Sequence, residues 1–218
     1  MKTRLHLLTL LFSFFLIAAV SAQCPTENVT LSSQADVASF VANYPTCTTI
    51  PTPLNISGSD ISDLSGLQFI TKIETDLNIS QNPILTSLQG LHNITLVGDD
   101  MSITNNGSLS DLTGLDGLQT ISEDFAISNN HQLTSLSGLE KLESAGKLYF
   151  YNNKITSMTG LENLSQIGTG GLVISINDNL TSLSGLEGLQ SISGNLSIGG
   201  NAQLSSIQAL QNLDPATI

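Results

Sequence analysis

The chain is organised by a repeated segment, LNISQNPILTSLQGLHNITLVGDD, which is seen most clearly at residues 77–100. Its aliphatic residues alternate in Leu77-Asn78-Ile79 and then recur at every third position from Leu85 to Ile94. Alternation with a period of two is typical of a strand, whereas a period of three fits successive turns and does not fit a long helix. The segment therefore predicts one short strand followed by turns that keep aliphatic side chains on the inner side.

The same pattern recurs along the chain at intervals of 23 or 24 residues. Its consensus is L-x-I-x-x-N-x-x-L-x-S-L-x-G-L-x-x-L-x-x-I, and both shorter units lose a residue just after the asparagine turn. Because one unit cannot enclose its own seven or so aliphatic side chains, neighbouring units must stack with their strands parallel, about 4.8 Å apart. We therefore expect a mainly β solenoid over residues 54–218, with strands that begin at Leu54, Leu77, Met101, Phe125, Leu148, Leu172 and Leu196.

Two polar columns accompany the aliphatic residues. The asparagine side chains can satisfy backbone groups at a tight turn, so we predict a structural role for them. The glycines are expected either to adopt a φ that other residues avoid or to allow close packing. The asparagines are Asn82, Asn106, Asn130, Asn153, Asn177 and Asn201, and the glycines are Gly66, Gly90, Gly114, Gly138, Gly160 and Gly185.

Residues 23–53 precede the repeats and contain both cysteines, Cys24 and Cys47. In an exported chain a disulfide between them is the default, and no further metal ligands lie near them in the sequence. Apolar residues between the cysteines fall at helical spacing, which predicts a disulfide-stapled N-terminal cap with a short helix. The residues concerned are Val37, Phe40, Val41 and Tyr44 for the apolar face, Ser32 or Ser33 for the N-cap and Pro45 for the end.

Residues 1–22 have the pattern of a signal peptide. Lys2 and Arg4 precede an apolar run, and Val20-Ser21-Ala22 provides small or modest residues at a cleavage site. The run is too short to span a membrane comfortably. We therefore expect the mature protein to be exported with no integral membrane span, and to be secreted or displayed on the cell surface, with the periplasm as an alternative.

The charge of the chain excludes some classes of partner. The full chain has a formal net charge of −12, and removal of Lys2 and Arg4 leaves four basic and 18 acidic residues, a net charge of −14. Such a charge disfavours nucleic acids and anionic membranes, whose phosphates need basic residues. The absence of Trp and the low aromatic content also argue against a surface for stacking bases.

The units GLEGLQSISGNLSIGGNAQLSSI, residues 185–207, and GLDGLQTISEDFAISNNHQLTSL, residues 114–136, resemble the leucine-rich repeats of the receptor L-domain family. The resemblance covers about residues 24–218. It implies a right-handed β-solenoid of leucine-rich-repeat type with a capping helix at its N-terminal end, and it implies no catalytic activity. Members of the bacterial type are secreted or surface proteins that usually continue with a closing C-terminal cap.

No such cap is visible here. The last complete strand, around Leu196 to Ile198, is therefore expected to be an exposed edge unless residues 202–218 fold over it. An incomplete sequence is the favoured explanation.

Outward positions of the strands are the candidate binding sites. Asp76, Asp100 and Asp124 precede successive strands and are expected to stack about 5 Å apart and repel one another. A solvated acidic face is the favoured interpretation, and a weak divalent-cation site is the alternative. Tyr149 and Tyr151 lie on one coil and the same face, which predicts either a contact surface for a partner or packing of the two rings on each other.

The sequence contains no nucleophile elbow, phosphate-binding glycine loop or metal-ligand spacing, so we expect no enzyme, no cofactor and no metal. The interpretation is a non-catalytic secreted or cell-surface interaction module that binds an unidentified extracellular protein or glycan on its sheet face. The alternatives are a structural spacer of the envelope and an accessory fragment of a larger adhesin or enzyme.

Overall fold

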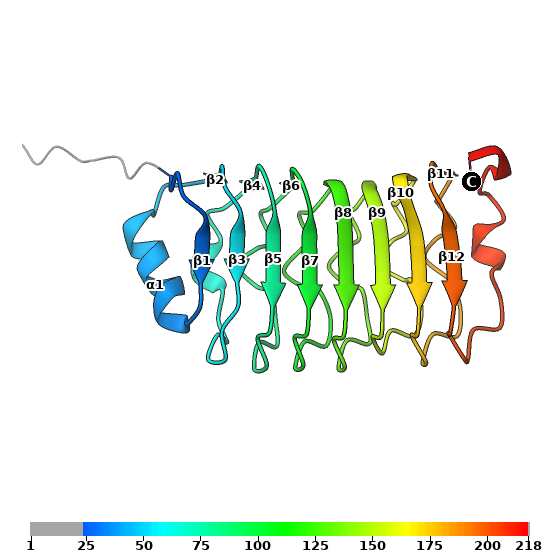
Figure 1. The fold of residues 1–218 in the computed structure, drawn as a ribbon, viewed down its shortest axis with the longest axis horizontal. Coiled ribbons are helices and arrows are strands. Elements are labelled where there is room, and N and C mark those ends of the chain that lie inside the picture. Colours follow the sequence, from blue (N-terminus) through cyan, green and yellow to red (C-terminus); the bar gives the residue numbers. More distant parts are fainter. Residues whose placement is uncertain (1–23, 218) are drawn as a thin grey trace, which may run out of the picture.

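The computed structural model describes residues 24–217, so the expected signal peptide at residues 1–22 lies outside the described part. The chain forms a β-solenoid of about seven turns with roughly 24 residues per turn and one α-helix near the N-terminus, which confirms the predicted fold class (Figure 1). All strand pairs are parallel and belong to one sheet that runs around two sides of the coils.

The first wall of the sheet faces the viewer in Figure 1. Its strands are β1 (Val29–Leu31), β3 (Leu54–Ile56), β5 (Leu77–Ser80), β7 (Met101–Thr104), β8 (Thr120–Ser128), β9 (Ser144–Tyr151), β10 (Gln166–Ser175) and β12 (Leu196–Gly199). The second wall contains β2 (Thr49–Ile50), β4 (Lys72–Ile73), β6 (Leu96–Val97) and β11 (Ser191–Ile192). The long strands β8, β9 and β10 bend through both walls, because each pairs with its neighbours at both of its ends.

The register places equivalent residues of the repeat directly beside one another. Leu77 pairs with Leu54 on one side and with Met101 on the other, as the spacing of the sequence predicts. The inward residues form one continuous hydrophobic core, in which each fully buried side chain contributes on the order of 1.5–3 kcal/mol. In the coil that begins at Leu172 the seven aliphatic residues of the repeat consensus are all buried: Leu172, Ile174, Leu180, Leu183, Leu186, Leu189 and Ile192.

The asparagine column forms a hydrogen-bonded ladder inside the turns, which confirms its structural role. Asn130 is completely buried, and its Nδ2 donates to the Ile103 carbonyl of the preceding coil at 2.9 Å. Its Oδ1 accepts the backbone N–H of Asn106, also at 2.9 Å. The next asparagines of the column repeat this pattern, so each turn is tied to the coils on both sides.

Both expected roles of the glycines occur. Gly138 has a φ of 110°, and a Cβ there would lie 2.1 Å from the Leu112 carbonyl oxygen, so the position requires glycine in two ways. Gly66 belongs instead to the short 3-10 helix η1 (Ser65–Leu67) and has no positive φ. Its added Cβ would lie 2.9 Å from Val41 Cγ2, so this glycine allows the capping helix to approach.

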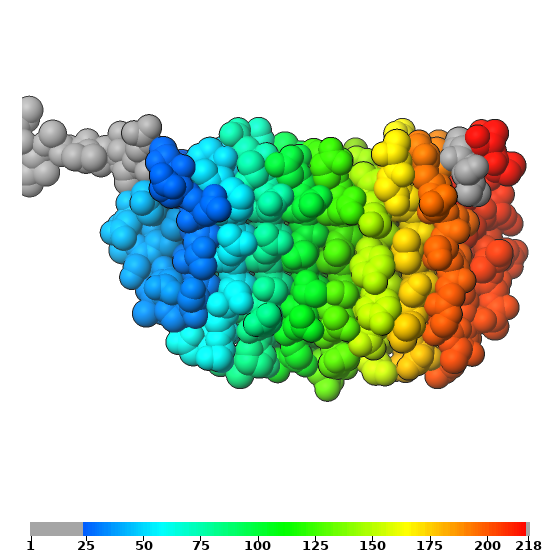
Figure 2. Space-filling model, viewed as in Figure 1, coloured from blue at the N-terminus to red at the C-terminus, as the bar shows by residue number. Residues whose placement is uncertain are grey.

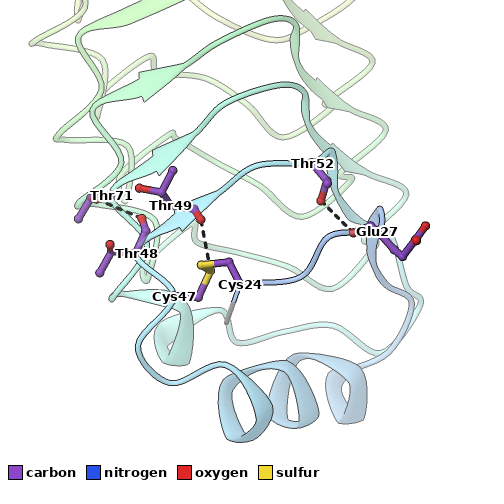
Figure 3. The surroundings of a disulfide bond; sticks show 7 residues. All are labelled: Cys24, Glu27, Cys47, Thr48, Thr49, Thr52 and Thr71. Carbon is purple, nitrogen blue, oxygen red and sulfur yellow. Dashed lines mark hydrogen bonds between the residues drawn. A yellow bond between two sulfur atoms is a disulfide. The ribbon is translucent and has the colours of Figure 1, made fainter. Parts of the chain in front are cut away.

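The N-terminal cap contains the helix α1 (Gln34–Asn43), whose N-cap is Ser33. The Ser33 Oγ accepts the backbone N–H of Asp36, which satisfies one of the free donors of the first turn. Cys24 and Cys47 form the predicted disulfide, with their Cα atoms 5.0 Å apart (Figure 3). The bridge ties the start of the described chain to the segment that leads from α1 into β2.

The strands start one coil earlier than the sequence analysis predicted. β1 pairs with β3 over three residues, with Val29 beside Leu54, and α1 covers its far side. At the other end of the described chain, β12 pairs with β10 alone, so the expected edge strand is present. Residues 200–217 complete the last coil and contain the 3-10 helices η2 (Gln208–Leu210) and η3 (Pro215–Thr217).

Candidate functional site

The candidate site lies on the outer surface of the first wall, which we call the sheet face. It is made of the residues between the inward ones, arranged in two columns that run across the strands. The first column is Asn78, Ser102, Ala126, Tyr149, Val173 and Ser197, and the second is Ser80, Thr104, Ser128, Tyr151, Ser175 and Gly199. Figure 2 shows this side as successive bands of the chain, one for each coil.

Tyr149 and Tyr151 are the two large aromatic side chains of these columns. Their ring centroids lie 5.8 Å apart with an interplanar angle of 9°, so the rings stack on each other along one strand. Both residues are half-buried rather than fully exposed. The packing of the two rings on each other is therefore confirmed, and both tyrosines remain partly exposed to solvent.

Small side chains lie on both sides of the tyrosine pair. The register places Tyr149 between Ala126 and Val173. Tyr151 lies between Ser128 and Ser175 in the same way. The two rings therefore form a ridge that stands above its neighbours on the sheet face.

A cation and an acid border this ridge. The Lys147 Nζ lies 6.0 Å from the centroid of the Tyr149 ring and forms an ion pair with Asp124 Oδ2 at 3.1 Å. Both partners of this ion pair are partly solvent-exposed, so its contribution to stability is below about 1 kcal/mol. Its structural effect is to hold the ammonium group beside the aromatic ridge.

The aspartate column is arranged differently from the expected stack of repelling carboxylates. The Asp76 Oδ1 accepts the backbone N–H of Asp100 at 3.2 Å, and the Asp100 Oδ1 accepts the backbone N–H of Asp124 at 2.9 Å. Each carboxylate therefore faces a donor of the next coil, and the column ends at the Lys147 ammonium group. In residues 24–217 no three or more His, Cys, Asp or Glu side chains form a group that could hold a metal ion.

Other acidic residues also serve the turns. Glu140 accepts the backbone N–H of Gly138 at 2.9 Å, and Glu187 accepts that of Gly185 at 2.7 Å. Asp63 accepts the backbone N–H of Ser65 at 2.8 Å, and this hydrogen bond holds the pKa of the Asp63 carboxyl below its usual value. Part of the negative charge is therefore used to cap backbone donors rather than to form a ligand site.

A flank rich in hydroxyl groups was missed by the sequence analysis. The Thr-Ser-Leu-Ser-Gly part of the repeat places serines and threonines beside the sheet face, and the repeated letters alone could have revealed it. In the structure Ser135 Oγ accepts the backbone N–H of Ser137 at 3.1 Å, and Ser182 and Ser206 make equivalent bonds in later coils. These hydroxyl groups form turns within the coils, which is a structural role.

None of the helices within residues 24–217 has the length and apolar character needed to cross a membrane. No protein-family model, curated protein or solved structure matches the chain.

Proposed function

We propose that the protein is an exported, non-catalytic interaction module that binds an extracellular protein or glycan through its sheet face. The proposal includes the leucine-rich-repeat character and the kinship to receptor L-domains that the repeat units suggest. It is supported by the Cys24–Cys47 disulfide, which is typical of an oxidising compartment, and by the signal-peptide pattern at residues 1–22.

The observation that carries the proposal is the stacked pair of Tyr149 and Tyr151 on a rigid strand. Tyrosine is enriched at binding hot spots because it offers a large contact area and a polar tip with few rotatable bonds. The parallel sheet holds the backbone of β9 on both sides, and the rings hold each other. Because the strand and the rings are already ordered, little conformational entropy is lost when a partner covers the ridge.

The surroundings of the ridge define the chemistry of a suitable partner. The Lys147 ammonium group and the Asp124 carboxylate provide one donor and one acceptor at its border, and the two phenol hydroxyls provide both. The small neighbours Ala126, Ser128, Val173 and Ser175 leave room for a partner to contact the sides of the rings. A neutral polar surface, such as a glycan chain or a protein loop, fits this combination better than a polyanion, because the protein itself is acidic.

The test is a screen of the purified protein against arrays of extracellular proteins and glycans, followed by affinity measurements on any partner found. We expect the Tyr149→Ala/Tyr151→Ala double variant to lose at least tenfold in affinity while its circular dichroism and thermal midpoint stay close to those of the wild type. The matched control is Ile84→Ala, which truncates an exposed apolar side chain at 49% exposure in a turn outside the two columns.

Different outcomes separate the candidate functions. Unchanged affinity in the double variant would place the binding surface elsewhere on the protein. The absence of any selective partner, together with tolerance of substitutions throughout the sheet face, would favour a structural spacer of the envelope.

A further inference from the structure

The strands β8, β9 and β10 differ at the corner where each bends from the second wall into the first (Figure 1). In β9 one residue, Gly146, separates the inward Ala145 from Lys147, where pairing in the first wall begins. The same corner contains two residues in β8 and three in β10, and the register shifts at both places. The corner of β9 is therefore the shortest of the three and lies between two longer ones.

The residues at this corner are also small. An added Cβ at Gly146 would lie 2.8 Å from the Ser122 carbonyl oxygen, so no larger residue fits there without a shift of the backbone. Ala145 occupies an inward position that the other coils of the described chain fill with isoleucine or valine, namely Ile50, Ile73, Val97, Ile121, Ile167 and Ile192. The short corner leaves a hollow of about 260 Å³, which we call the corner groove and which is lined by residues 120–122, 144–146, 166–168, 191 and 193.

The corner groove has an apolar floor and a polar rim. Its floor contains the buried Ile121, Ala145 and Ile167. Six polar side chains line it as well: Thr120, Ser122, Ser144, Gln166, Ser191 and Ser193. Within residues 24–217 none of these six side chains hydrogen-bonds to another group of the protein. By contrast, the hydroxyl groups of Ser135 and Ser137 on the flank rich in hydroxyl groups lie 2.8 Å apart and satisfy each other.

Four of the six polar residues follow one another across the strands. The register places Ser144 between Thr120 and Gln166. It also places Ser191 beside Gln166, and neighbouring strands lie about 4.8 Å apart. A molecule that lies in the corner groove therefore meets polar groups of successive coils at regular intervals.

The chemistry of the lining selects one class of ligand. The lining contains no charged side chain, whereas a metal cation needs carboxylates and an anion needs basic residues. An apolar ligand would leave the hydroxyl groups and the amide without partners. The hydroxyl groups of a neutral sugar both donate and accept, as those of serine and threonine do, and its C–H groups can rest on the apolar floor. The volume lies below the range of about 300–1,000 Å³ for drug-sized ligands, so it suits a single sugar ring.

We propose that the corner groove binds one unit of a neutral glycan, whose next units extend over the tyrosine ridge. This inference rests on the proposed function and selects a glycan rather than a protein as the partner. Both surfaces belong to β9, because Ser144 lines the groove while Tyr149 and Tyr151 form the ridge. The five residues from Ser144 to Tyr149 span at most about 17 Å, which an oligosaccharide can cover.

Neutral monosaccharides test the corner groove without the ridge. We expect amide NMR spectra of the isotope-labelled protein to show binding of at least one of glucose, galactose, mannose and N-acetylglucosamine. The titration extends to about 100 mM, well above a dissociation constant in the millimolar range. The signals that shift should belong to residues 120–122, 144–146 and 166–168, with those of α1 unchanged. No binding of any of these sugars, or shifts confined to other residues, would overturn the proposal.

Loss of hydroxyl groups without a change of shape provides a second test. Thr120→Val/Ser144→Ala keeps both side chains close to their original size, and it should weaken binding of the monosaccharide at least about fivefold. The matched control is Ser62→Ala/Thr86→Val, which removes one hydroxyl group from each of two exposed residues in earlier coils and should leave the affinity unchanged. An unchanged affinity in Thr120→Val/Ser144→Ala would contradict the proposal.

An oligosaccharide of the same sugar separates the corner groove from the tyrosine ridge. Thr120→Val/Ser144→Ala and Tyr149→Ala/Tyr151→Ala should each weaken its binding. If only Thr120→Val/Ser144→Ala does so, the groove is confirmed and the ridge is not the binding surface of the proposed function. If only Tyr149→Ala/Tyr151→Ala does so, the ridge retains its proposed function and the groove proposal is wrong.

Discussion

The Asn106 Oδ1 accepts two hydrogen bonds from Asn82 of the preceding coil, one from its backbone N–H at 3.2 Å and one from its Nδ2 at 2.9 Å. The Asn82 Nδ2 also donates to the Ile56 carbonyl at 3.0 Å. One asparagine thus joins three successive coils, and both asparagines are completely buried although neighbouring residues of the turn are exposed. Hydrophobic packing holds the coils together, and this ladder fixes the path of the chain between them.

Removal of one ladder amide should be strongly destabilising. Asn130→Ala leaves the N–H of the buried Asn106 and the carbonyl of the buried Ile103 without their partners. We expect the free energy of unfolding to fall by about 3 kcal/mol or more, as measured by chemical denaturation. Asn179→Ala removes an exposed amide of the same type and should change it by less than about 0.5 kcal/mol. Equal effects of the two substitutions would show that the ladder contributes little.

One position of the repeat is occupied by an unsuitable residue. Ile176 has a φ of 56°, in a column where earlier coils place Gln81, Asn105, Asn129 and Asn152 at similar values. A β-branched residue is strained in the left-handed region, and Ile176 is also 42% exposed.

Ile176→Asn should therefore stabilise the protein by about 1 kcal/mol in thermal or chemical unfolding. Asn105→Ile, the reciprocal change in an exposed residue of the same column, should destabilise it by a similar amount. A loss of stability with Ile176→Asn would mean that the isoleucine side chain contributes contacts worth more than the strain.

The glycine column should tolerate substitution only where the backbone allows it. Gly138→Ala meets both a φ of 110° and the Leu112 carbonyl, so we expect a loss of about 3 kcal/mol or more, or no soluble protein. Gly107→Ala meets no atom within 4 Å and should be neutral or slightly stabilising. The measurement is the unfolding midpoint of both variants under one buffer condition.

Loss of the disulfide should loosen one end of the molecule. Reduction of Cys24–Cys47 opens a loop of 23 residues, which is worth about 3 kcal/mol by the chain-entropy relation. In a solenoid each coil contacts chiefly its neighbours, so the effect should stay local. Hydrogen exchange should show faster exchange in α1 and β1 and unchanged protection in β9 and β10. Uniformly faster exchange would indicate instead that the cap stabilises the whole array.

The repeat period predicted the coils because burial follows a local rule. Leu77 and Met101 are 24 residues apart in the sequence, and they pair directly in the sheet. The helix at 34–43 was equally visible, since its apolar residues, its N-cap serine and the following proline lie within one short segment. β1 escaped prediction because only Val29, Thr30 and Leu31 carry the alternation, which is too short a signal without the coil beside it.

The candidate site was predicted less completely. The alternation of β9 placed Tyr149 and Tyr151 on one face, but only the structure shows that their rings stack on each other between small neighbours from the coils on either side. The aspartate column was expected to repel, and instead Asp76 and Asp100 each accept a backbone N–H from the next coil, while Asp124 accepts from the Lys147 ammonium group. That N–H belongs to a residue 24 positions away, so no local pattern indicates it.

The sequence alone therefore accounts for the coil, its inward residues and the stacking of one coil on the next. The reason is that each unit of 23 or 24 residues carries the same spacing of hydrophobic residues. The pairing of polar groups arose from the stacked structure, since the partner of each asparagine or aspartate lies one coil away. The partial exposure of Leu196 and Ile207 was also decided by the tertiary structure, because their repeat positions are buried in earlier coils and no further coil packs against them within residues 24–217.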